Sequence, residues 1–203
     1  MIREDVGRLI AVVRYRTADG LDRVLGALAD AGVPALEITL DTPGALDAIA
    51  RAAERGDLVG AGTVLSADQV GAAADAGARF VASPHLVPAV VDAATARGID
   101  AFPGVLTPGE LARALEAGAR AVKLFPAAAV GPAYVRTLRG PYPDVPIVPT
   151  GGIAIADVRG YLAAGATAVG LGSSLVGAVP PADDLGMTAL RDRAREAVAA
   201  TRG

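Results

Sequence analysis

Short hydrophobic stretches recur along the chain, and most of them follow a helix-like segment that ends at a glycine. Asp30-Ala31-Gly32, for example, comes shortly before the apolar stretch that begins at Ala35. A glycine just past the last helical residue is a common helix end, and a short apolar run is typical of a buried strand. The glycines that fit this role are Gly32, Gly56, Gly77, Gly98, Gly118, Gly140 and Gly165. They predict seven points at which a helix leads into a strand.

The repeat predicts eight strands that alternate with helices. The first strand covers about residues 9–14, and a last helix covers about residues 186–200. Thr42-Pro43 predicts an N-cap and a first helical residue, and Thr107-Pro108-Gly109-Glu110 predicts a capping box. Strict alternation is typical of a parallel sheet. Eight units predict an α/β protein with one compact (β/α)8 TIM barrel and a short N-terminal helix; an open doubly wound sheet is the alternative.

The composition indicates a globular chain. Of the 203 residues, 52% are apolar, and the mean hydropathy of +0.43 excludes disorder. No linker-like stretch divides the sequence, so residues 1–203 are expected to form one barrel domain. The sequence has no run of about 18 apolar residues and no apolar stretch behind its charged start. A cytoplasmic location is therefore expected.

Charge and residue types exclude several kinds of site. A net charge of −3 without a basic run argues against nucleic acid and anionic membranes as partners. The absence of cysteine excludes disulfides and thiolate metal sites, and the single histidine, His85, excludes sites that need two histidines.

The basic residues single out one position. Of 19 basic residues only Lys123 is a lysine, and it stands in the sixth predicted strand. A barrel strand is covered on both faces, so this side chain is expected inside or at the mouth of the barrel. Burial disfavours a charged ammonium, and a neutral amine can attack a carbonyl to form a Schiff base. The alternative is a lysine that reaches the rim or pairs with a carboxylate.

The second predicted strand carries polar residues on one face. Its polar positions are Glu37, Thr39 and Asp41, and its apolar positions are Leu36, Ile38 and Leu40. The apolar set suits the helix side, so the polar set is expected to point inward. A glutamate that faces Lys123 can move protons around an iminium. The alternatives are a structural salt bridge between Glu37 and Lys123, and a metal held by Glu37 and Asp41 without help from a histidine.

Active sites of such barrels lie at the carboxyl ends of the strands. The glycine-rich ends of the last two strands, at residues 148–153 and 169–174, predict a phosphate site built from backbone N–H groups, unless these glycines serve only tight turns. Arg14 ends the first strand and is a candidate fork for a carboxylate, or half of a rim salt bridge. Thr63 offers a hydroxyl at the mouth, and His85 is either a substrate contact or a rim residue.

These segments together resemble the 2-keto-3-deoxy-6-phosphogluconate (KDPG) aldolase family, which includes 2-keto-4-hydroxyglutarate and 2-dehydro-3-deoxy-6-phosphogalactonate aldolases. The resemblance runs in order over about residues 9–178. The matching segments are residues 36–40, 60–64, 83–86, 102–105, 107–110, 123–126, 140–143, 149–152 and 172–173.

The resemblance implies a class I aldolase that acts on a small-molecule substrate without a metal or other cofactor and assembles as a homotrimer. It implies cleavage of KDPG, its galactonate epimer or 4-hydroxy-2-oxoglutarate to pyruvate and glyceraldehyde 3-phosphate or glyoxylate, as in Entner–Doudoroff carbohydrate metabolism. Lys123 would be the Schiff-base lysine and Glu37 the general acid and base. The implied substrate-binding residues are Arg14, Thr63, Pro84, Phe125, Gly151, Gly152, Gly172 and Ser173.

Asp41 departs from the family pattern, because some members carry an arginine there that helps to bind substrate. A carboxylate at this position repels an anionic substrate, so the identity of the substrate stays open. Two other functions are alternatives to the aldolase: a phosphate-binding epimerase or isomerase without imine chemistry, and a non-catalytic protein that binds a phosphorylated sugar acid.

Overall fold

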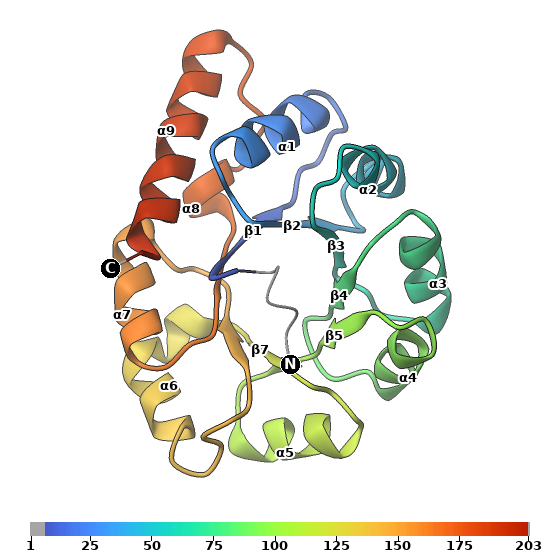
Figure 1. Ribbon diagram of the computed structural model, residues 1–203, viewed down its shortest axis with the longest axis vertical. Helices are drawn as coiled ribbons and strands as arrows, with labels where there is room; N and C mark the ends of the chain where they lie inside the picture. Colours follow the sequence, from blue (N-terminus) through green and yellow to red (C-terminus); the bar gives the residue numbers. More distant parts are fainter. Residues whose placement is uncertain (1–6, 203) are drawn as a thin grey trace.

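The structure is a computed structural model that describes residues 7–202. Short strands lie around the centre and helices surround them on the outside (Figure 1). The strands are β1 (Leu9–Val13), β2 (Ala35–Thr39), β3 (Val59–Gly62), β4 (Phe80–Ala82), β5 (Asp100–Phe102), β6 (Gly104–Val105), β7 (Val122–Leu124), β8 (Ile147–Pro149) and β9 (Val169–Leu171). The helices are α1 (Leu21–Asp30), α2 (Ala45–Glu54), α3 (Ala67–Asp75), α4 (Pro88–Ala96), α5 (Pro108–Glu116), α6 (Gly131–Leu138), α7 (Val158–Ala163), α8 (Ser173–Val176) and α9 (Asp184–Ala200).

All pairings between named strands are parallel, which confirms the predicted α/β class. The strands form two sheets, one with the order β5-β4-β3-β2-β1-β9 and one with the order β6-β7-β8. Each strand therefore presents its carboxyl end to the same side, and the segments that follow the strands gather there.

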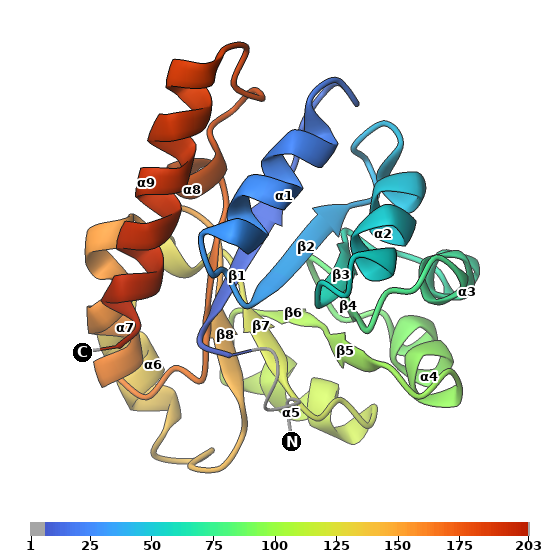
Figure 2. The same cartoon turned by 45° about the horizontal axis from the view of Figure 1, so that its top comes forward.

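The pairing differs from the one continuous eight-stranded sheet that the sequence predicts. The fifth predicted strand is split into β5 and β6 at Pro103, and the two pieces follow one another along the chain (Figure 2). Proline has no N–H to give to a neighbouring strand, which explains the interruption. At the other boundary, β8 and β9 are linked by an isolated bridge between Thr150 and Gly170.

The predicted helix ends follow from local hydrogen bonds. At α1, for instance, the Gly32 N–H bonds the Ala29 carbonyl and the Val33 N–H bonds the Leu28 carbonyl. This is a Schellman motif, and it requires a left-handed residue that glycine supplies without strain. The same positive φ occurs at Gly32, Gly56, Gly77, Gly98, Gly118 and Gly165. Gly140 is the exception, because the next residue is Pro141, which has no N–H to complete the motif.

The predicted helix starts have different outcomes. The capping box of Thr107 and Glu110 is confirmed at α5, and the last helix is confirmed as α9. The predicted N-cap at Thr42 is wrong, because the residue that precedes α2 is Gly44, whose backbone has a left-handed conformation. The Thr42 hydroxyl instead accepts the Tyr15 N–H at 3.2 Å. The predicted N-terminal helix lies outside the described residues. No helix within residues 7–202 is long and apolar enough to cross a bilayer.

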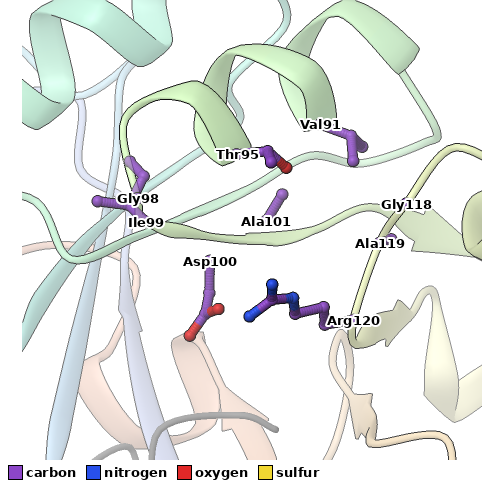
Figure 3. Close-up of a pocket in the computed structure, with 9 residues that line it drawn as sticks. All are labelled: Val91, Thr95, Gly98, Ile99, Asp100, Ala101, Gly118, Ala119 and Arg120. Carbon is purple, nitrogen blue, oxygen red and sulfur yellow. The ribbon is translucent and has the colours of Figure 1, made fainter.

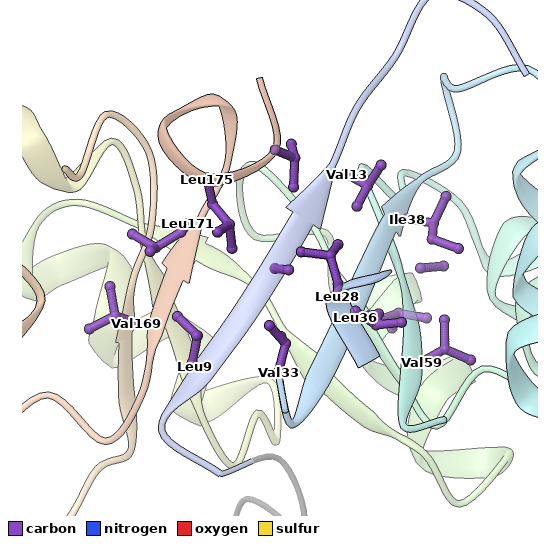
Figure 4. Close-up of a cluster of buried hydrophobic side chains, with 14 of the residues drawn as sticks. Leu9, Val13, Leu28, Val33, Leu36, Ile38, Val59, Val169, Leu171 and Leu175 are labelled. Carbon is purple, nitrogen blue, oxygen red and sulfur yellow. The ribbon is translucent and has the colours of Figure 1, made fainter. Parts of the chain in front are cut away.

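Two hydrophobic clusters divide the core. The larger lies between strands and helices; Figure 4 shows Leu9, Leu36 and Val169 of this cluster on three strands. The smaller cluster contains Phe80 and Phe102, whose ring centroids are 5.3 Å apart. Its full buried set is Ile10, Ala35, Phe80, Ala82, Phe102, Ala121, Val148 and Ala168. Because side chains alternate along a strand, Glu37 and Lys123 share the face of this smaller cluster.

Candidate active site

Lys123 and Glu37 form a buried pair between two strands that are distant in sequence. Lys123 lies in β7 and Glu37 in β2, and the Lys123 Nζ donates a hydrogen bond to Glu37 Oε1 at 3.0 Å. The two side chains are only 10% and 3% exposed. Removal of one partner from such a pair would leave an unpaired charge in the interior, which costs several kcal/mol. The inward orientation predicted for Glu37 is therefore present, and so is the salt bridge that the sequence left as an alternative.

Two glycines on β3 make room for side chains that point into the interior. A Cβ at Gly62 would collide with Glu37 Oε1, and a Cβ at Gly60 would collide with the ring of Phe80. Gly60 lies opposite Glu37 in the register of β2 and β3. Gly62 is thus needed so that the Glu37 carboxylate can lie across the strand and reach Lys123, whereas Gly60 makes room for the Phe80 ring.

Arg14 joins the ends of three strands at the rim. Its Nη1 lies 3.0 Å from Asp41 Oδ2, and its Nη2 donates to Thr63 Oγ1 at 2.7 Å. The Arg14 and Asp41 side chains are 58% and 47% exposed, so this ion pair contributes little to stability. Thr63 has a φ of 56°, a left-handed conformation that is uncommon for a β-branched residue. Such backbone strain often accompanies a functional site.

A cavity of about 880 Å³ opens at the carboxyl ends of the strands. A volume of this size is enough for a drug-sized ligand. Eight of the ten predicted site residues line it: Arg14, Glu37, Lys123, Phe125, Gly151, Gly152, Gly172 and Ser173. The structure therefore brings together residues from both ends of the chain.

The segment after β8 contains two glycines that have a positive φ and lie close to neighbouring side chains. Gly151 and Gly152 have φ values of 95° and 74°. A Cβ at Gly151 would lie 2.8 Å from the Phe125 ring, and one at Gly152 would lie 2.8 Å from the Ala128 Cβ. Neither N–H has an intramolecular acceptor within residues 7–202. The Phe125 ring in turn stands 5.9 Å from Lys123 Nζ, within reach of a cation–π contact.

Two predicted site residues do not line this cavity. Thr63 does not line the cavity itself, but its hydroxyl accepts a hydrogen bond from Arg14, which does. Pro84 follows β4 in a partly buried turn, with its carbonyl packed against Gly104. His85 beside it is exposed, and no lining position of the cavity is a histidine.

Three polar lining residues, Tyr15, Arg16 and Thr150, were not assigned a role by the sequence analysis. Tyr15 and Arg16 directly follow Arg14, and Thr150 directly precedes Gly151, so their nearness to predicted residues was the available signal. The buried Tyr15 hydroxyl donates to the Val176 carbonyl at 2.8 Å. Burial raises the pKa of Tyr15 to about 12, so this hydroxyl stays a donor.

A second cavity lies at the opposite ends of the strands, where β5 begins. Its volume is about 110 Å³, and Asp100 and Arg120 face one another across it (Figure 3). Asp100 Oδ2 is buried without a hydrogen-bond partner within the described part of the chain. Its small volume and the absence of the Lys123–Glu37 pair leave the large cavity as the candidate active site. No group of three or more metal-ligating side chains occurs within residues 7–202.

Comparisons with known proteins agree on one family. The family model described as KDPG and KHG aldolase matches residues 2–185. A probable 2-dehydro-3-deoxy-6-phosphogalactonate aldolase of Rhizobium meliloti is 39% identical over 171 residues, which are 82% of this chain and 81% of that protein.

Solved structures agree with this assignment. A native KDPGal structure has a TM-score of 0.86 at 34% identity, covering 96% of this chain and 94% of its own. A KDPG aldolase from Legionella pneumophila, with pyruvate captured as a covalent carbinolamine intermediate, has a TM-score of 0.78 at 29% identity and covers 98% and 94% of the two chains. The chain therefore belongs to the KDPG and KHG aldolase family of carbon–carbon lyases.

Proposed function

We propose that this aldolase is a class I enzyme that reversibly cleaves a 2-keto-3-deoxy-6-phospho sugar acid to pyruvate and glyceraldehyde 3-phosphate. The observation that carries the proposal is the buried Lys123–Glu37 pair, with 3.0 Å between its nitrogen and oxygen, in a cavity lined by two glycine-rich loops. An amine and a carboxylate at this distance supply a nucleophile and a proton acceptor for imine chemistry.

The first stage forms an imine. Lys123 passes a proton to Glu37, and the neutral amine attacks the C2 carbonyl of the substrate to give a carbinolamine. Glu37 returns the proton to the carbinolamine hydroxyl, which leaves as water, so that a protonated imine joins C2 to Nζ. The carbinolamine of the Legionella relative supports this stage.

The second stage breaks the C3–C4 bond. Glu37 takes the proton of the C4 hydroxyl, the C4–O bond becomes a carbonyl, and the C3–C4 electron pair moves into the imine to give an enamine. Glyceraldehyde 3-phosphate leaves. Glu37 then delivers its proton to C3, and water hydrolyses the pyruvate imine to free Lys123.

The proposed binding roles follow the arrangement of the cavity. Arg14, with Thr63 hydrogen-bonded to it, receives the carboxylate of the 2-keto acid, which competes with Asp41 for the guanidinium. Pro84 and Phe125 bound the pyruvyl group. Backbone N–H groups of the loops at Gly151–Gly152 and Gly172–Ser173 bind the phosphate, because successive N–H groups in glycine turns form anion-binding concavities.

We also propose that the strands close into one (β/α)8 barrel and that residues 1–203 form a single domain. Two contacts support closure: the Lys123 N–H bonds the Pro103 carbonyl at 2.9 Å across the interrupted strand, and the bridge between Thr150 and Gly170 joins the two sheets. A homotrimer and a cytoplasmic location are further proposals that rest on the family resemblance. Sedimentation equilibrium should give the mass of three chains.

The two epimers at C4 are both candidate substrates. The relatives include proteins named for the galactonate compound and for the gluconate compound. The alternatives of an epimerase without imine chemistry and of a non-catalytic binder gain no support from these two relatives, which are both named as aldolases.

The proposed chemistry is tested by adding pyruvate, reducing with borohydride and mapping the adduct by peptide mass spectrometry. The sequence has a single lysine, so the N-terminal amine is the one competing primary amine. We expect the adduct on Lys123, and a parallel sample without pyruvate should show none. A folded protein that gives no adduct on Lys123 would overturn the proposal.

A further inference from the structure

The charged side chains that line the active-site cavity are not all paired with one another. They are Arg14, Arg16, Glu37, Asp41 and Lys123. Lys123 pairs with Glu37 and Arg14 pairs with Asp41, each at 3.0 Å. Arg16 is exposed and has no ion pair or hydrogen bond through its side chain to any residue within 7–202. Among the described residues, the Arg16 guanidinium therefore remains available to an anion from solution.

Tyr15, the residue before Arg16, is hydrogen-bonded to the segment at residues 172–177, which contains α8. The Tyr15 hydroxyl donates to the Val176 carbonyl at 2.8 Å, and the Tyr15 N–H donates to the Thr42 hydroxyl at 3.2 Å. Gly172, Ser173 and Gly177 of that segment line the same cavity as Arg16. Arg16 therefore lines the cavity beside the glycine-rich loop at Gly172–Ser173, and the residue before it, Tyr15, is buried.

Arg14 is not free to serve this end of the cavity. Its guanidinium already contacts Asp41 and Thr63, which follow β2 and β3. Backbone N–H groups of the glycine-rich loops are dipoles without net charge, so they alone leave a phosphate dianion unneutralised. A guanidinium offers a planar fork that matches two phosphate oxygens, and its charge strengthens each hydrogen bond.

We propose that Arg16 is a specificity-determining residue that binds the distal phosphate of the substrate. The enzyme then prefers 2-keto sugar acids that end in a phosphate monoester over those that end in a hydroxyl. This inference rests on the proposed aldolase function and adds to it a side chain that recognises the phosphate.

The test compares two substrates in wild-type protein and Arg16→Gln. One is the 6-phosphorylated 2-keto-3-deoxy acid of the epimer that wild type cleaves, and the other is the same acid without phosphate. Loss of a charge-assisted contact should lower kcat/KM for the phosphorylated acid about 10- to 100-fold, mostly through KM. The value for the unphosphorylated acid should change less than about twofold, and Arg16→Lys should fall between.

A second measurement does not depend on a slow substrate. Inorganic phosphate is used as a competitive inhibitor, and its inhibition constant should rise by a similar factor in Arg16→Gln. Arg136→Gln is the matched control, because Arg136 is an exposed arginine of α6 that does not line the cavity. It removes the same charge and should leave both readouts unchanged.

Two failures are distinguishable. If wild-type protein gives no borohydride-trapped pyruvate on Lys123, the proposed function is overturned and this inference with it. If Arg16→Gln traps pyruvate as wild type does, but keeps the wild-type ratio of the two kcat/KM values and the wild-type phosphate inhibition, the role of Arg16 alone is overturned.

Discussion

Lys123 and Glu37 are buried together, so the chemistry of each residue depends on the other remaining in place. A pair this far from water is lost when either partner changes its charge or its reach. The nitrogen of a lysine can exist as a neutral nucleophile, whereas a guanidinium stays protonated. Substitutions that change the proton chemistry of one partner are therefore the informative ones at this site.

Lys123→Arg should abolish aldol cleavage and pyruvate trapping, because a guanidinium cannot form the imine. The measurement is the rate of pyruvate release together with peptide mapping after borohydride. Circular dichroism and the thermal midpoint establish that the variant is folded. Retention of cleavage by a folded Lys123→Arg protein would contradict the Schiff-base mechanism.

Glu37→Gln should separate imine formation from bond cleavage. The amide keeps the shape of the side chain but cannot take the C4 proton, so cleavage should slow by about 10²- to 10⁴-fold. Borohydride should still trap pyruvate on Lys123 in a long incubation, because water can replace Glu37 as a slower proton carrier in imine formation. Cleavage at the wild-type rate in this variant would remove Glu37 from the proposed role.

At the scale of single elements, the glycine at the end of a helix adopts a left-handed backbone conformation that strains other residues. Gly118 has a φ of 89°, and a Cβ there would meet no atom within 4 Å, so a substitution suffers from backbone strain alone. Gly118→Ala should lower the free energy of unfolding by about 1–2 kcal/mol. Gly140→Ala is the matched control, since Gly140 lacks a positive φ, and should stay within about 0.5 kcal/mol of wild type. Urea titration measures both, and equal effects would refute the explanation.

The capping box of α5 predicts a pH dependence. Hydrogen bonds from the Leu106 and Thr107 backbone N–H groups lower the pKa of Glu110 below its ordinary value. A group with a lowered pKa stabilises the fold above its ordinary pKa, and this stabilisation is lost as the pH falls through the folded pKa. Glu110→Gln should cost about 1 kcal/mol or less at neutral pH, because the group is partly exposed to water.

The difference between wild type and Glu110→Gln should shrink as urea titrations move from neutral pH into acid. Glu54→Gln, at an exposed position of α2, is the control for loss of a carboxylate without a cap. A difference that stays constant with pH would show that the carboxylate charge has no part in the cap.

At the scale of the whole molecule, the smaller hydrophobic cluster connects strands from distant parts of the chain. Gly60→Ala would drive a Cβ into the buried Phe80 ring, which stacks on Phe102. Overpacking of this kind should cost about 1–3 kcal/mol. Gly26→Ala is the counterpart, because Gly26 lies within α1 with open space around it, and it should stabilise by roughly 0.5–1 kcal/mol. Thermal unfolding of the two variants should move in opposite directions.

The sequence alone determined the order of strands and helices, the parallel class, most helix ends and the capping box of Thr107. These features depend on hydrogen bonds between residues close along the chain and on which face of an element is apolar. The same reasoning indicated Lys123 and Glu37, because each is a charged residue in a segment that must be buried on both faces.

Only the tertiary structure decided which side chains meet. Glu37 and Lys123 are 86 positions apart, and Arg14 reaches both Asp41 and Thr63, so these contacts depend on how whole strands register against one another. The lack of an ion-pair partner for Arg16 within residues 7–202 has the same origin. Local sequence fixes which groups a strand carries, but the distance between groups on different strands is set by packing of the complete sheet, to which every element contributes.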